Sequence, residues 1–162
     1  FFQAEDGIRD ISVWLEFNVC SSDLTARQPT GRLKPGTRGN APKLEALPAI
    51  GERLYRKQVN SAFICTSLDA DLRASGISVL VIAGLTTNHC VSTTARMAGN
   101  LGYLTFVAAD ATAAFDGAHL DGRLRPAGGV HDAALSDLHG EFAQVVTTRW
   151  LIDAISRSSH DA

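Results

Sequence analysis

From about residue 53 to the end of the chain, segments with the apolar pattern of strands alternate with segments that have the apolar spacing of helices. Four short segments predict strands, at 53–57, 79–83, 103–108 and 144–148. Four others carry the spacing of amphipathic helices, at 66–75, 91–101, 130–142 and 150–155. The run at 79–83 is the most apolar and predicts a central buried strand. Strands that alternate with helices predict an α/β fold with a mostly parallel sheet covered on both faces.

The first 50 residues of the chain follow a different pattern. Residues 11–17 alternate in the manner of an edge strand. Residues 1–24 as a whole nevertheless closely resemble translated sequencing-adapter read-through and begin without methionine. We therefore predict that this segment is not native and exclude it from the fold. Residues 25–50 are rich in proline and glycine and predict a long loop. A second, polar surface loop is predicted at 116–125.

Composition narrows the functional classes. A chain of 162 residues fits one domain, and a net charge of −2 without a basic stripe argues against a nucleic-acid partner. No apolar run approaches the roughly 20 residues of a membrane span, and no signal peptide is evident. The three cysteines, Cys20, Cys65 and Cys90, lack metal-ligand spacing. They predict reduced thiols in a cytoplasmic protein rather than a disulfide framework.

Cys90 is the first candidate for chemistry. It follows the apolar run at 79–83, Gly84 and a short polar turn, and it starts a helical pattern. The carboxyl end of a parallel strand is where open α/β sheets bind ligands. A helix N-terminus also favours a thiolate, which makes Cys90 a candidate nucleophile. The alternative is a small buried residue in a strand–helix turn.

A reactive thiolate needs a base or a cation nearby. The histidine candidates are His89, His131 and His139. The alternative for His89 is a turn position whose side chain points away from that of Cys90. The alternatives for His131 and His139 are surface or cap roles. A zinc site is not predicted, because the histidines are scattered. Lys57 remains, at the end of a predicted strand, although such a lysine is usually solvated.

Several motifs are similar to those of the isochorismatase-like cysteine hydrolase superfamily. They are Lys57-Gln-Val-Asn-Ser-Ala-Phe63, Thr66 with Leu68, Val81-Ile-Ala-Gly-Leu-Thr-Thr-Asn-His-Cys90-Val91, Thr94-Ala95, Gly102-Tyr103 and Asp110-Ala-Thr112. The resemblance extends over about residues 25–151. It implies a Rossmann-like three-layer α/β/α sandwich, and it groups the chain with nicotinamidases, N-carbamoylsarcosine and ureidoacrylate amidohydrolases, and isochorismatases.

The resemblance also implies roles for individual residues. Cys90 would be the nucleophile, and Lys57 the cation that favours its thiolate and orients it. The Leu85–Thr86 bond would be the family's non-proline cis peptide. The N–H groups of Thr86 and Cys90 would then form the oxyanion hole. Phe63 and Thr87 are candidate substrate-binding residues, with a core position as the alternative for Phe63.

One part of the family pattern has no counterpart in this sequence. The family opens with a strand ending in Asp-x-Gln, whose aspartate is catalytic, and a second strand that supplies metal ligands in nicotinamidases. Asp6 and Asp10 do not sit in that motif, and Asp110 is interpreted as a structural residue at a strand end. We expect residues 25–162 to be the C-terminal part of one hydrolase domain lacking its first two strands. Residues 1–162 alone are then expected to be inactive and poorly stable.

These observations predict a hydrolase that cleaves a C–N bond of a small amide, ureide or carbamoyl compound through a thioester. The thiol favours this reaction over the vinyl-ether cleavage of isochorismatases, which needs no thiol nucleophile. A non-catalytic relative that binds a ligand or a partner protein is the alternative from another class. We expect a small-molecule substrate, no cofactor or metal in this chain, and a homodimer or homotetramer at full length.

Overall fold

The computed structural model of the protein describes residues 53–158. The predictions for residues 1–24, for the loop at 25–50 and for Cys20 lie outside the described residues. In chain order the described elements are α1 (Leu68–Ala74), β1 (Val79–Leu85), the π-helical turn η2 (Thr87–Val91), α2 (Ser92–Asn100), β2 (Leu104–Ala113), β3 (Gly117–Ala118), β4 (Leu124–Arg125), α3 (Ala127–Ser136), β5 (Gln144–Val146) and α4 (Thr148–Ser158).

Strands β1, β2 and β5 form a parallel sheet in that order. Within residues 53–158 the middle strand is therefore β2, and the run predicted to be central, β1, pairs on one side only. The pairing of β1 with β2 is regular from Val79 to Ile82 and shifts before Gly84. Gly84 has a φ of +114°, a conformation that L side chains rarely adopt. The irregularity thus falls where β1 leads into the turn that carries Cys90.

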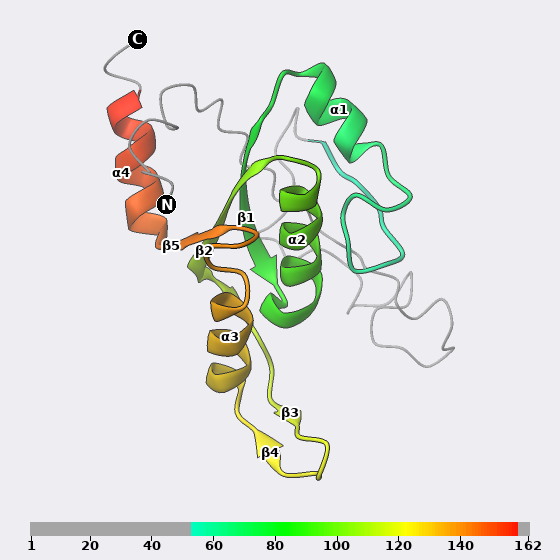
Figure 1. Cartoon of the computed structure of the whole chain (residues 1–162), viewed down its shortest axis with the longest axis vertical. Helices are drawn as coiled ribbons and strands as arrows, with labels where there is room; N and C mark the ends of the chain where they lie inside the picture. The colour runs from blue at the N-terminus through cyan, green and yellow to red at the C-terminus, as the bar shows by residue number, and fades with distance from the viewer. Residues whose placement is uncertain (1–52, 159–162) are drawn as a thin grey trace.

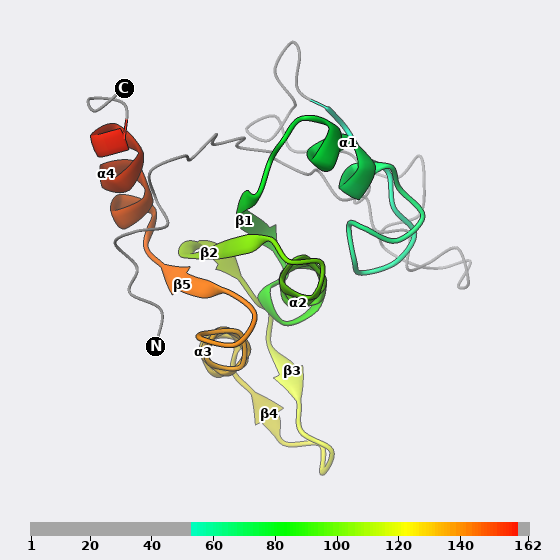
Figure 2. The ribbon, with the colours of Figure 1, turned by 45° about the horizontal axis from the view of Figure 1, so that its top comes forward.

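Helices cover both faces of this sheet, and the alternation along β2 shows how (Figures 1 and 2). Val107 and Ala109 pack with residues of α2 and α3 on one face. Phe106 and Ala108 pack with Leu151 of α4 on the other. Successive side chains of a strand point to opposite faces, so one strand contributes to two cores. This arrangement confirms the predicted α/β class and its three layers.

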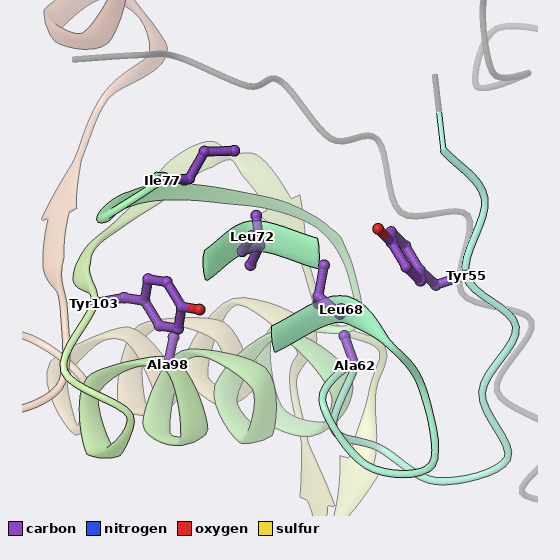
Figure 3. Packing of buried hydrophobic residues seen from close by; sticks show 7 residues of the cluster. All are labelled: Tyr55, Ala62, Leu68, Leu72, Ile77, Ala98 and Tyr103. Atoms are coloured by element: carbon purple, nitrogen blue, oxygen red, sulfur yellow. The ribbon is translucent and has the colours of Figure 1, made fainter. Parts of the chain in front are cut away.

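A third cluster joins α1 to the C-terminal end of α2 (Figure 3). Leu68 and Leu72 of α1 pack with Ala98 of α2 and with Tyr103. The turn after α2 is closed by Gly102, with a φ of +88°, and Tyr103 N donates to Ala98 O at 3.0 Å. The cluster therefore fixes the end of α2 against the segment that follows Lys57.

Several boundaries differ from the prediction. Residues 53–57 belong to neither described sheet. Lys57 is the one residue of this segment that has β-bridge pairing. Helix α3 starts three residues earlier than predicted, because Asp116 caps the N–H of Ala127 at 2.8 Å, and it ends at Ser136. The predicted polar loop contains the short hairpin β3–β4, which extends away from the sheet (Figure 1).

No helix within residues 53–158 combines the length and the apolar composition that a membrane crossing requires.

Candidate active site

Cys90 lies just beyond the carboxyl end of β1, at the position predicted from the sequence. Strand β1 ends at Leu85, and the Leu85–Thr86 peptide bond is cis, where the resemblance places such a bond. The roles of Leu85, Thr86 and Cys90 in an oxyanion hole stay predictions. The turn places a half-buried Cys90 two residues before the first residue of α2.

The turn that carries Cys90 is π-helical rather than the first turn of the predicted α-helix. Val91 N donates to Thr86 O at 3.2 Å, which closes the wider ring of a π-turn. Thr87 has no exposed surface, and its hydroxyl is 2.8 Å from Nδ1 of His131 on α3. The Thr87 side chain thus anchors the turn to α3. Any substrate contact by Thr87 stays a prediction.

Lys57 is buried, with 2% of its surface exposed. Its Nζ donates to Val59 O at 3.0 Å and to Asn60 O at 2.6 Å. Among the described residues it takes part in no ion pair. Burying an ammonium group is costly unless it is well hydrogen-bonded, so the loop after Lys57 is built around this side chain rather than leaving it in solvent.

Asn60 connects the lysine loop to the cysteine. Cys90 Sγ lies 3.9 Å from Asn60 Oδ1, while the backbone oxygen of Asn60 accepts the Lys57 bond. Thr94 of α2 donates to the same backbone oxygen at 3.5 Å. Asn60 belongs to the motif at 57–63, but its sequence pattern predicts no role for it. Its contact joins residues 30 positions apart, which no local spacing rule reveals.

The other candidate partners lie elsewhere. His89 is exposed, with Nε2 3.2 Å from Nδ2 of Asn88. His139 follows α3, and its Nδ1 accepts a bond from Val145 N at 3.1 Å. Phe63 stacks on Tyr103 with ring centroids 5.9 Å apart and packs against the α1–α2 cluster. This gives Phe63 the core contacts that were its alternative interpretation, while a pocket role stays a prediction.

The carboxylates of the described residues lie apart from Lys57 and Cys90. Asp110 accepts two hydrogen bonds from Thr148 at the start of α4, and these bonds hold the pKa of its carboxyl below the usual range. This agrees with the structural role predicted for it. Within residues 53–158 no hydrogen bond joins Cys90 or Lys57 to a carboxylate. The same residues contain no group of three or more His, Cys, Asp or Glu that could hold a metal.

The chain was then compared with known families. The isochorismatase domain matches residues 5–149. The chain belongs to the isochorismatase family. The matched range starts inside the segment 1–24, and the foreign origin predicted for that segment stays a prediction. An isochorismatase family protein of Bacillus subtilis, YrdC, is 40% identical over 154 residues, covering 93% of this chain and 82% of YrdC.

Solved structures of the family give the same fold. A family member from Chromobacterium violaceum has a TM-score of 0.76 at 42% identity, covering 80% of this chain and 67% of that one. A cysteine hydrolase from Pseudomonas syringae has a TM-score of 0.73 at 27% identity, covering 78% of this chain and 59% of that one.

A relative with a named amide substrate is also similar in sequence. The maleamate amidohydrolase of Pseudomonas putida is 32% identical over 113 residues, or 70% of this chain. The chain spans 46% of that enzyme's length.

Proposed function

We propose that this protein is a cysteine hydrolase that cleaves a C–N bond of a small amide, ureide or carbamoyl compound. The observation that carries the proposal is the convergence of Lys57 and Cys90 on a single residue, Asn60. A buried cation and a half-buried thiol gathered at the carboxyl end of a parallel strand form a suitable setting for a nucleophile. The kinship with a cysteine hydrolase and a maleamate amidohydrolase supports the thiol and the amide substrate respectively.

In this mechanism the Cys90 thiolate attacks the carbonyl carbon of the substrate. The oxygen becomes an oxyanion, and the N–H groups of Thr86 and Cys90 stabilise it. The aspartate that the resemblance implies on the family's first strand would accept the thiol proton and pass it to the nitrogen as the C–N bond breaks, which leaves an acyl thioester on Cys90. Water hydrolyses the thioester and frees the acid. Lys57 favours the thiolate through its positive charge.

The test uses p-nitrophenyl acetate, because its nitrophenolate leaves without the help of a general acid. The acylation step is thereby separated from any need for a carboxylate. We expect a burst of nitrophenolate and an acetyl adduct on the peptide that contains Cys90, detected by mass spectrometry. Cys90→Ala should abolish both. Cys65→Ala is the matched control, since Cys65 is an exposed free thiol, and it should keep both.

A second assay addresses the bond that is cleaved. Ammonia release is measured with maleamate and with a small panel of other amides and ureides. Turnover that depends on Cys90 would support the proposal, and it would contradict the expectation that residues 1–162 alone are inactive. If the Cys90→Ala variant still gave the burst and carried the acetyl group on another residue, Cys90 would not be the nucleophile. A wild-type protein that binds panel compounds but never acylates would favour the non-catalytic binding module.

A further inference from the structure

Asn60 makes contacts with both members of the proposed catalytic pair through different parts of the residue. Its backbone oxygen accepts bonds from Lys57 Nζ at 2.6 Å and from Thr94 Oγ1 at 3.5 Å. Its side-chain oxygen lies 3.9 Å from Cys90 Sγ, within range for a weak S–H···O bond. The side chain therefore serves the cysteine alone among these contacts, and the backbone serves the lysine.

The backbone around Asn60 is held by groups that do not involve its side chain. Ala62 N donates to Thr94 Oγ1 at 3.2 Å, and Phe63 N donates to Ser61 Oγ at 3.2 Å. Ser61 and Ala62 are 3% and 2% exposed. A change at the Asn60 side chain should therefore leave the loop and the Lys57 contacts in place.

We propose that Asn60 is a positioning residue whose carboxamide holds Cys90 Sγ in both of its protonation states. The thiol donates to Oδ1, as the geometry shows. When the thiol loses its proton, rotation of the amide presents an N–H of Nδ2 to the thiolate, since an amide carries both a donor and an acceptor. This inference rests on the proposed function, in which Cys90 is the nucleophile.

An isosteric substitution separates the shape of the Asn60 side chain from its ability to donate a hydrogen bond. Asn60→Asp keeps the shape but replaces the amide with an acceptor-only carboxylate, which repels a thiolate. The charged or titratable residues on the turn and on the helices and strands that contact it are His89, Arg96, Asp110, His131 and Asp132. With Lys57 they are identical in wild type and variant, so their effects cancel in the comparison.

The experiment measures alkylation of Cys90 by iodoacetamide as a function of pH, resolved by peptide mass spectrometry. Iodoacetamide is neutral, so the new carboxylate does not repel the reagent. We expect Asn60→Asp to shift the Cys90 profile upward by about one pH unit or more. Exposed Cys65 in the same samples is an internal reference and should not shift. Asn100→Asp, at the exposed end of α2, is the matched control and should leave Cys90 unchanged.

Asn60→Ala is the second variant and removes donor and acceptor without adding charge. It should shift the profile upward by less than Asn60→Asp, with circular dichroism confirming that both variants are folded. Unchanged Cys90 profiles in folded Asn60→Asp and Asn60→Ala would overturn the inference. That result is distinct from failure of the proposed function, because alkylation requires no substrate and no turnover.

Discussion

The carboxylate of Asp110 on β2 accepts hydrogen bonds from both the N–H and the hydroxyl of Thr148, at 2.7 and 2.8 Å. Thr148 is the first residue of α4, so a residue of β2 caps a helix that begins 38 positions later. Thr147 adds a second cap, since its Oγ1 accepts from Trp150 N at 3.2 Å. Two of the unpaired N–H groups at the start of α4 are thereby satisfied.

Asp110→Ala should lower the melting temperature by a few degrees, because α4 loses a charged cap. The hydrogen bonds from Thr148 lower the Asp110 pKa, so this contribution is present above the carboxyl's ordinary range, about pH 4, and is lost as pH falls further. The melting temperatures of wild type and variant should therefore converge as the pH is lowered from 7 to 3. Asp132→Ala, an exposed aspartate of α3, is the control. Equal melting temperatures at pH 7 for Asp110→Ala and wild type would contradict the cap.

Tyr103 predicts a loss of stability in alkali. Its hydroxyl donates to Asp69 Oδ1 at 2.7 Å, and burial, followed by the hydrogen bond to Asp69, raises its pKa to about 12. The raised pKa means that the stabilisation is full below pH 10 and disappears as pH rises toward about 12. Tyr103→Phe should flatten the dependence of unfolding on pH in this window. Absorbance at about 295 nm should show the late tyrosinate step disappear from the two-tyrosine chain. An identical alkaline profile in Tyr103→Phe would refute the assignment.

Much of the fold was predictable because its signals are local. The apolar run at 79–83 and the amphipathic spacing at 91–101 each report on neighbours within a few residues. Lys57 and Cys90 both contact Asn60. This convergence agrees with the roles that the family resemblance implies for the two residues, and those roles stay predictions.

What was missed depends on contacts between distant residues. The start of α3 is set by Asp116, 11 positions before Ala127, and the thiol contact of Asn60 spans 30 positions. The π-turn at Cys90 leaves the apolar spacing of the following helix almost unchanged, so its pattern looks like one continuous α-helix. The hydrogen bond between Thr87 and His131 likewise joins elements that sequence patterns treat separately.

Lys57→Met tests the electrostatic role of the lysine. Without the ammonium group, the iodoacetamide profile of Cys90 should move upward by roughly one to three pH units. The loss of its two hydrogen bonds should also destabilise the fold, by about 1–3 kcal/mol. Arg56→Met is the matched control, because it removes an equal charge from the adjacent exposed residue. If both variants shift the profile equally, the effect comes from net charge and not from the buried site.

Gly99 tests how closely α2 packs against the segment after α3. Alanine usually favours a helix over glycine by about 1 kcal/mol. At Gly99, however, a Cβ atom would lie 2.8 Å from the backbone oxygen of Phe142. Gly99→Ala should therefore destabilise the protein by about 1–3 kcal/mol, against its helix propensity.

Gly129→Ala in α3 is the control, since no heavy atom lies within 4 Å of its added Cβ. It should be neutral or stabilising by up to about 1 kcal/mol. Denaturant unfolding of both variants gives the comparison, with unchanged slopes required for a direct reading. A more stable Gly99→Ala would mean that Phe142 moves away easily. The close packing of α2 against the segment after α3 would then not be a constraint on the helix that follows Cys90.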